Sequence, residues 1–312
     1  MSEKGKTEKL LWAVLTVAVA ALVAFTGGYY LGVITTQSEG IMFVDDYGRQ
    51  IKLSEIPQRI VSVAPTSTEI LFAVGAGGQV VGVDEMSDYP AEAADLPKVG
   101  NYVLSVEAIV ALKPDLIICA DLVPEALDNL QDQGYPYVVL AARTVTDAIK
   151  DIRLVGVITG HVEEANEVAS ALELRLEAVK AKTLAPSVSR PDVYLEYYGP
   201  DELWTFGPGS FGDDIIRLAG GINIAANTSS EYPMISSEFV VGADPDIIVY
   251  TVGMMTTTNA TSITQRPGWG GISAVVSGTI YPIDENLVVR YGPRILDGLE
   301  QMAEILHPEL FT

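Results

Sequence analysis

Hydrophobic and polar residues alternate over residues 41–53 (IMFVDDYGRQIKL) on both sides of a central DYG, and this pattern predicts a short β-hairpin. An aliphatic strand begins at Ile60. A helix is expected next, with Thr66 as its N-cap and Glu69 completing a capping box, and the apolar run QVVGV follows as another strand. Strand, helix and strand in this order predict a βαβ unit and therefore a parallel sheet.

An internal repeat indicates how the chain is organised. Residues 105–119 (SVEAIVALKPDLIIC) align without a gap with residues 236–250 (SSEFVVGADPDIIVY). Each copy places a serine to cap a short helix, a glutamate in the first helical turn, and Pro-Asp before a buried strand. The repeat therefore predicts two α/β lobes of similar build.

A long helix is predicted between the lobes, because residues 162–183 are rich in Ala, Glu, Leu and Lys and lack Gly and Pro. The predicted fold class is α/β, with two Rossmann-like lobes joined by one long helix and preceded by an N-terminal transmembrane helix. The expected segments are a cytoplasmic tail (1–9), a transmembrane anchor (10–34), a spacer with the hairpin (35–56), an N-terminal α/β lobe (57–142), a helical linker (143–184) and a C-terminal α/β lobe (185–312).

The anchor is predicted from hydropathy. Residues 10–34 form a run of 25 positions without a charged residue, which is enough to cross a hydrocarbon core of about 30 Å. Three lysines precede the run and the next basic residue after it is Arg49, so the bulk of the chain is expected on the extracytoplasmic face of the cytoplasmic membrane. A cleaved signal peptide is the alternative, although its apolar region is usually shorter.

Composition limits the partners. The 312 residues include 41 Asp and Glu against 19 Lys and Arg, a net charge of −22 that argues against nucleic-acid binding. The single cysteine rules out an intrachain disulfide and a Cys-cluster metal site, and two isolated histidines do not supply a metal cage. We therefore expect no cofactor and no protein-bound metal.

Aromatic residues indicate a large, partly apolar ligand. Tyr outnumbers Phe 14 to 7, and many rings fall in loops at predicted strand ends, where a ring can also pack over the sheet. These rings include Tyr89, Tyr197, Trp204, Phe206 and Tyr291. Arg290 is a basic residue in a very acidic domain, and its two interpretations are contact with an anionic ligand group and an ordinary salt bridge.

A glycine-rich turn allows a function of another class. Residues 207–212 (GPGSFG) fit the G-x-G-x-x-G pattern of phosphate cradles, so an anchored enzyme that uses Gly207 to Gly212 for an anionic substrate is an alternative. The acidic pair Asp213 and Asp214 would repel a pyrophosphate, and no G-x-S-x-G nucleophile elbow occurs. We expect a helix that starts at the groove between the lobes, and no enzyme activity.

The ordered motifs resemble one family. RIVSVAPTSTEILFAVGAGGQVVGV, SDYP, KVGNY, TFGPGSFGDDIIRLAGG and RYGPRILDGLEQMAEILHPELF are similar to segments of the substrate-binding proteins of ABC importers for vitamin B12, ferric siderophores and haem. The resemblance implies that Glu107 and Glu238, which the repeat places at matching positions, dock on arginines of the paired permease subunits. Together with the aromatic pattern, it gives the expected ligand-binding residues Thr66, Met86, Tyr102, Tyr198, Trp204, Tyr232 and Arg290.

The resemblance thus implies a membrane-anchored, monomeric receptor that captures an iron-siderophore-type metal chelate and delivers it to an ABC permease dimer with its ATPase. A corrinoid or haem receptor of the same architecture is the alternative. Family members that bind vitamin B12 often carry Tyr or Trp where Met86 and Asn101 stand here, which favours the siderophore prediction.

Overall fold

The computed structural model describes residues 40–101, 103–120, 125–199, 202–253, 256 and 258–311. The predicted anchor at residues 10–34 and the expected ligand residue Tyr102 lie outside this part of the chain. Within it, no helix has both the length and the hydrophobicity needed to span a membrane.

The predicted hairpin is confirmed. Strands β1 (Ile41–Val44) and β2 (Gln50–Leu53) pair antiparallel, with Val44 opposite Gln50. The two strands form a small unit of their own, whereas the turn at residues 45–49 belongs to the main unit with the chain from Ile56 onward.

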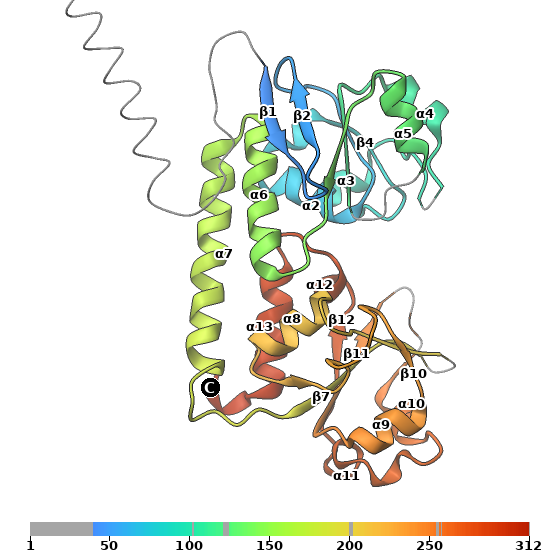
Figure 1. The fold of residues 1–312 in the computed structure, drawn as a ribbon, viewed down its shortest axis with the longest axis vertical. Coiled ribbons are helices and arrows are strands. Elements are labelled where there is room, and N and C mark those ends of the chain that lie inside the picture. Colours follow the sequence, from blue (N-terminus) through green and yellow to red (C-terminus); the bar gives the residue numbers. More distant parts are fainter. Residues whose placement is uncertain are drawn as a thin grey trace, which may run out of the picture. The chain divides into compact units, whose positions relative to one another are not determined.

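The main unit begins with an N-terminal lobe built on a fully parallel sheet in the order β4-β3-β5-β6 (Figure 1). Its strands are β3 (Ile60–Ser62), β4 (Val80–Val83), β5 (Leu116–Ala120) and β6 (Tyr137–Leu140). Its helices are α2 (Pro65–Ala73), η1 (Ala76–Gln79), α3 (Ala91–Ala94), α4 (Val106–Leu112) and α5 (Glu125–Asp132). The predicted βαβ unit is present as β3, α2 and β4.

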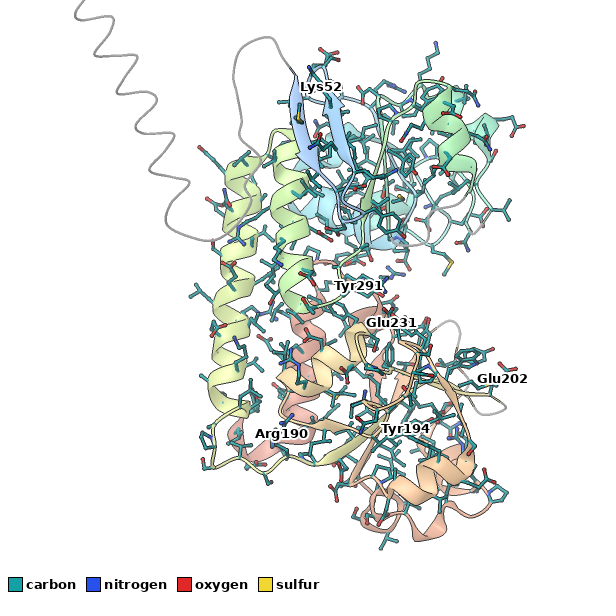
Figure 2. The ribbon with its side chains drawn as sticks, viewed as in Figure 1. Lys52, Arg190, Tyr194, Glu202, Glu231 and Tyr291 are labelled. Carbon is teal, nitrogen blue, oxygen red and sulfur yellow. The ribbon has the colours of Figure 1, made fainter. Side chains whose placement is uncertain are left out.

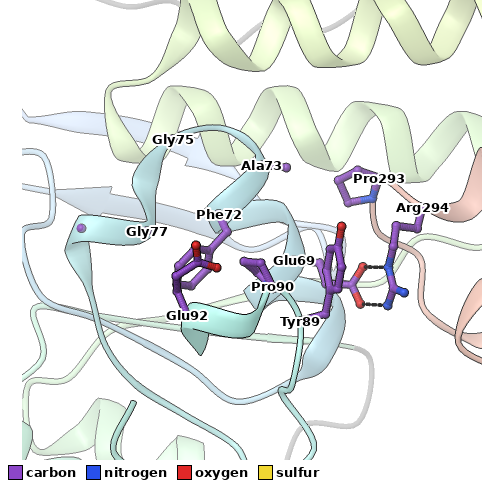
Figure 3. Close-up of a pocket in the computed structure, with 11 residues that line it drawn as sticks. Glu69, Phe72, Ala73, Gly75, Gly77, Tyr89, Pro90, Glu92, Pro293 and Arg294 are labelled. Atoms are coloured by element: carbon purple, nitrogen blue, oxygen red, sulfur yellow. Dashed lines mark hydrogen bonds and ion pairs between the residues drawn. The ribbon is translucent and has the colours of Figure 1, made fainter. Parts of the chain in front are cut away.

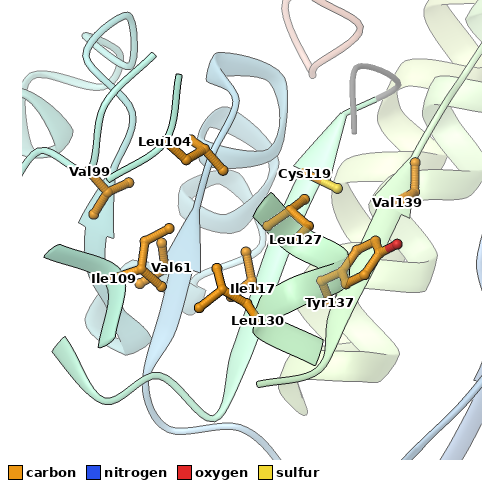
Figure 4. Close-up of a cluster of buried hydrophobic side chains, with 10 residues drawn as sticks. All are labelled: Val61, Val99, Leu104, Ile109, Ile117, Cys119, Leu127, Leu130, Tyr137 and Val139. Atoms are coloured by element: carbon orange, nitrogen blue, oxygen red, sulfur yellow. The ribbon is translucent and has the colours of Figure 1, made fainter. Parts of the chain in front are cut away.

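Apolar residues hold this lobe together. Val61, Ile117 and Val139, one from each of three adjacent strands, pack with Ile109 of α4 and Leu127 of α5 in one buried cluster (Figure 4). Each fully buried aliphatic side chain contributes about 1.5–3 kcal/mol relative to an exposed one. The cluster therefore fixes α4 and α5 on one face of the sheet.

Helix α2 starts differently from the prediction. Its N-cap is Ala64, no side chain caps it, and Pro65 is the first helical residue, so the capping box of Thr66 and Glu69 is wrong. Proline suits this position because its φ is already helical and it has no N–H to leave unpaired. The carboxylate of Glu69 is instead bound by Arg290 and Arg294.

Helices α6 (Val145–Thr159) and α7 (Val162–Thr183) follow, and α7 spans the residues that the alanine-rich pattern predicts. The two helices pack along each other. A Cβ atom at Gly156 would lie 2.2 Å from the Cβ of Ala165, so the close approach of the helices requires glycine there.

The C-terminal lobe has a six-stranded sheet in the order β10-β8-β7-β11-β12, with β9 beside β7. Its strands are β7 (Asp192–Tyr198), β8 (Leu203–Thr205), β9 (Ile222–Asn223), β10 (Met234–Ile235), β11 (Ile247–Val252) and β12 (Ile280–Asp284). Strands β7, β9, β11 and β12 are parallel to one another. Strand β8 pairs antiparallel with β7 on one side and with β10 on the other. Its helices are α8 (Phe211–Leu218), α9 (Ser237–Ala243), α10 (Ala260–Thr264), η2 (Trp269–Gly271), α11 (Ser273–Ser277), α12 (Asn286–Val289), α13 (Ile295–Leu306) and η3 (Pro308–Leu310).

The internal repeat is confirmed in detail. Ser105 caps α4 and Ser236 caps α9, each accepting a hydrogen bond from the backbone N–H three residues later. Lys113 and Asp244 end these helices in the same left-handed conformation, with φ of 48° and 47°. The chain then continues into β5 in one lobe and β11 in the other.

Candidate functional site

The candidate site lies where the N-terminal lobe meets the segment between α12 and α13. Thr66 follows the carboxyl end of β3, and residues 84–88 follow the carboxyl end of β4. Ligands of parallel α/β sheets bind outside these strand ends, because the loops and helix N-termini there converge. The chain therefore places Thr66 and Met86 at one edge of the same sheet.

Buried hydroxyl groups fix this edge. Ser62 and Ser67 are joined at 2.7 Å, Thr68 donates to Ser62 at 2.8 Å, and Thr68 and Ser87 are joined at 2.8 Å. Asp84 accepts hydrogen bonds from the Ser87 hydroxyl and, at 3.0 Å, from the backbone N–H of Met86. The network ties the loop after β4 to β3 and α2.

Burial changes the protonation of Asp84. Desolvation raises the pKa of this carboxyl, although hydrogen bonds from Ser87 and from the Met86 N–H, and the charges of Lys98 and Arg290, act in the opposite direction. The side chain is 2% exposed. Asp84 therefore organises the loop after β4 through its hydrogen bonds to Ser87 and Met86.

Arginines and carboxylates form the most connected part of the site. Glu69 accepts two hydrogen bonds from Arg294, at 2.9 and 2.6 Å, and one from Arg290 at 3.2 Å. Arg290 also donates to Asp88 at 2.7 Å and to the Met86 carbonyl at 3.4 Å. The expected ligand residue Arg290 is only 8% exposed and is held by salt bridges of this chain.

Tyr291 connects further expected ligand residues. Its backbone N–H donates to the Thr66 hydroxyl at 3.2 Å, and its own hydroxyl lies 3.0 Å from that of Tyr232. Figure 2 labels Tyr291 among the side chains of the main unit. Its ring stacks on Phe211 with a centroid distance of 4.6 Å, and Tyr232 packs against Phe206 at 5.8 Å. These contacts bring Thr66, Tyr232 and several aromatic rings into one continuous group.

Tyr198 and Trp204 form a separate group. They are cross-strand partners on β7 and β8, and the indole N–H of Trp204 donates to Glu202 at 3.0 Å. Tyr198 is 39% exposed. The cross-strand pairing places these two expected ligand residues side by side in the sheet of the C-terminal lobe.

The helix that follows the glycine-rich turn contacts the start of α6. Ser210 caps α8, and Asp214 in the first turn of α8 accepts a hydrogen bond from the backbone N–H of Val145 at 2.9 Å. Nearby, Arg143 and Glu231 form a salt bridge of 2.6 Å. The start of α8 therefore presents a carboxylate that accepts a hydrogen bond from α6, whereas a phosphate cradle presents N–H donors to an anion.

A pocket of about 570 Å³ lies beside the arginine cluster (Figure 3). Phe72 and Gly77 line one side of it, and Tyr89, Pro90 and Arg294 line another. The Arg294 guanidinium stacks over the Tyr89 ring at 4.1 Å, and Tyr89 is 47% exposed. The six expected ligand residues that the structure describes are not among those that line this pocket, whereas Tyr89 is one of the rings that the aromatic pattern indicates.

Glu107 and Glu238, the glutamates expected to dock on a permease, are both exposed, one on each lobe. Glu107 lies in the first turn of α4 and Glu238 in the first turn of α9. Hydrogen bonds from its own backbone N–H and from Ser236 lower the pKa of Glu238. Within the described residues, no group of three or more His, Cys, Asp and Glu side chains is placed to hold a metal ion.

Site prediction from the sequence missed Glu69 and Asp88 as partners of Arg290. Both lie in segments that carry the family resemblance, TSTE and SDYP. Their contacts with Arg290, however, join residues more than 200 positions apart in the chain. The aromatic pattern did signal Tyr89 and Tyr291. No local pattern distinguishes an arginine that meets a ligand from one that meets a carboxylate.

This fold and site define a two-lobed α/β solute-binding protein. The chain belongs to the periplasmic binding protein family, whose model matches residues 60–287. It is 30% identical to YvrC of Bacillus subtilis, described as an uncharacterized ABC transporter substrate-binding lipoprotein, over 86% of both chains. It is also 29% identical to a vitamin B12-binding protein of Vibrio cholerae over 80% of this chain and 89% of the relative.

Solved structures agree with this assignment. The periplasmic vitamin B12 binding protein BtuF of Vibrio cholerae has a TM-score of 0.71 at 27% identity, covering 81% of this chain and 98% of BtuF. The periplasmic heme-binding protein RhuT of Roseiflexus has a TM-score of 0.72 at 28% identity, covering 81% of this chain and 99% of RhuT. The chain is a solute-binding protein of an ABC transporter.

Proposed function

We propose that this chain is the extracytoplasmic receptor of an ABC importer and that it captures a metal chelate and delivers it to a permease dimer with its ATPase. The observation that carries the proposal is the matched pair of exposed glutamates. Glu107 and Glu238 occupy the same position of equivalent helices, each after a capping serine and before a parallel strand. A two-fold permease surface with paired arginines would be complementary to such a pair.

The ligand belongs to the class of large, partly apolar chelates. The partly exposed rings of Tyr232 and Tyr291 are held in place by the buried rings of Phe206 and Phe211. Exposed faces of such tyrosines suit the flat face of a macrocycle. Relatives named for vitamin B12 and heme support a corrinoid or haem, and we propose cobalamin as the first ligand to test.

A ferric siderophore is the second candidate. Met86 and Asn101 stand at positions where the resemblance leads one to expect aromatic rings in receptors for vitamin B12. Met86 and Asn101 have no ring and are smaller than Tyr or Trp, so they would leave room for a more globular chelate than a corrin. Ferrichrome therefore belongs in the same titration as cyanocobalamin and haemin.

Anchoring by a transmembrane helix is part of the proposal. Residues 10–34 are apolar and uncharged, and lysines precede them. The single cysteine, Cys119, is buried in β5 and therefore does not carry a lipid. Tethering would keep the receptor at a high local concentration beside its permease.

Binding and docking are tested separately. The full chain is titrated with cyanocobalamin, ferrichrome and haemin while tyrosine and tryptophan fluorescence is followed, and saturable binding of at least one chelate is expected. The absence of binding to all of them would reject the chelate-receptor proposal.

For docking, Glu107→Arg and Glu238→Arg are combined in one variant. Uptake through the permease should fall to background while the Kd for the chelate changes less than about twofold, because both side chains are exposed and the aromatic group is elsewhere. Glu163→Arg with Glu167→Arg on α7 is the matched control, with the same charge change at exposed positions. Normal uptake by the first variant would show that these glutamates do not dock.

A further inference from the structure

The salt-bridge cluster at the site is balanced in charge. Arg290 and Arg294 contribute two positive charges, and Glu69 and Asp88 contribute two negative charges. Arg290 is 8% exposed and its guanidinium is already held by Glu69, Asp88 and the Met86 carbonyl. An anionic ligand is therefore not needed to neutralise this arginine.

The two carboxylates differ in how firmly they are held. The Glu69 side chain is 1% exposed and receives hydrogen bonds from both arginines, so removing it would leave buried charge uncompensated. The Asp88 side chain is 62% exposed, and among the described residues it is paired with Arg290. Asp88 is thus the partner that a ligand could displace.

Displacement by an anion would be unfavourable in this environment. The carboxylate of Asp88 would lose its Arg290 partner in a chain with a net charge of −22. Asp84, in the same loop, is a further acid whose charge interacts with Arg290, so it offers an incoming anion no cationic partner. A neutral oxygen, such as an amide or hydroxamate carbonyl, could instead accept a hydrogen bond from Arg290 while Asp88 stays in place.

We propose that Asp88 is a specificity-determining residue, an internal counter-ion that occupies Arg290 and makes the site selective for neutral or cationic chelates over anionic ones. The inference rests on the proposed function and adds the charge class of the ligand. Corrinoids and ferric hydroxamates fall in the accepted class. Haem, with its propionates, and ferric catecholates fall in the rejected class.

The test compares Asp88→Asn with the native full chain, using cyanocobalamin and ferrichrome as neutral probes and haemin and ferric enterobactin as anionic probes at low ionic strength. The native protein should bind a neutral probe more tightly than either anionic probe. Asp88→Asn should tighten binding of the anionic probes about fivefold and change the neutral ones less than about twofold, as expected for loss of one partly exposed charge. Raising the salt concentration should reduce the difference.

Asp132→Asn is the control, because Asp132 is exposed at the end of α5 and its loss changes the net charge equally. It should leave all four affinities unchanged. Tighter native binding of an anionic probe, or an equal effect of Asp88→Asn on both classes, would overturn the counter-ion role while leaving the receptor function intact. Failure of all four probes to bind would overturn both.

Discussion

At the scale of single residues, Asp151 on α6 is a buried carboxyl without a paired cation among the described residues. It is 2% exposed, and its Oδ2 atom has no hydrogen-bond partner in the described structure. Burial raises its pKa well above the usual value, and the nearby carboxylates of Asp46 and Asp147 raise it further, against the weaker effect of Lys150. The folded state therefore holds this proton more tightly than the unfolded state does.

This linkage predicts a loss of stability with rising pH. The stabilisation that Asp151 contributes through its raised pKa is fully present below the pKa of the unfolded state, about 3.9. It is lost as the pH rises through the higher pKa of the folded state. Asp151→Asn mimics the protonated side chain, so it should raise Tm at pH 8 by roughly 2 °C or more and leave Tm almost unchanged at pH 4. Thermal unfolding of both proteins at the two pH values measures the difference.

Asp147 on the same helix is the contrasting control. Partial burial raises its pKa, but hydrogen bonds from Lys150 and Thr144 outweigh this and the net pKa is lowered. Its contribution is therefore present above the unfolded pKa and lost in acid. Asp147→Asn should lower Tm more at pH 8 than at pH 3. If the change in Tm caused by Asp151→Asn and that caused by Asp147→Asn varied with pH in the same direction, the extra proton would not belong to Asp151.

At the scale of elements, the repeated helices differ in one informative way. Lys113 and Asp244 occupy equivalent left-handed positions, which cost a non-glycine residue about 1–2 kcal/mol. The Asp244 carboxylate accepts hydrogen bonds from the Ser273 N–H at 2.7 Å and from its hydroxyl at 3.1 Å. Within the described residues, the Lys113 side chain makes no such hydrogen bond, and only its backbone carbonyl accepts one, from Arg59.

Glycine substitution should therefore have different effects in the two lobes. Lys113→Gly should stabilise the protein by about 0.5–1 kcal/mol, because glycine adopts this conformation without strain. Asp244→Gly gains the same relief but loses two hydrogen bonds, so it should be neutral or destabilising by about 1 kcal/mol. Urea unfolding gives both values, and a larger gain for Asp244→Gly would show that the carboxylate contributes nothing.

The same elements show what the sequence could and could not predict. The hairpin, the βαβ unit, the repeated helices and α7 depend on local periodicity and capping, and each occurs where the pattern places it. Helix α2 is the exception, because Pro65 outweighs the Thr66 capping signal. The salt bridges of Arg290 depend on tertiary packing across the chain, which no local pattern encodes.

At the scale of the whole main unit, the segment from Arg290 to Arg294 ties the lobes together. This segment leads into α13 of the C-terminal lobe, and its arginines bind Glu69 on α2 of the N-terminal lobe. The Val145 N–H bond to Asp214 and the Arg143 salt bridge to Glu231 are further links. With α6 and α7 joining the lobes, these contacts oppose large changes in the angle between them.

Glu69→Gln tests the strength of this tie. The amide cannot compensate the two guanidinium charges, so Arg290 keeps only the exposed Asp88 carboxylate and Arg294 loses its Glu69 partner. Breaking a buried ion pair in this way should lower the free energy of unfolding by about 3 kcal/mol, measured by urea denaturation. Glu92→Gln, an exposed change beside the same pocket, should stay within about 0.5 kcal/mol of the native protein. If both variants unfold like the native protein, the arginine cluster adds nothing to the connection between the lobes, and α6 and α7 with the remaining contacts must maintain it alone.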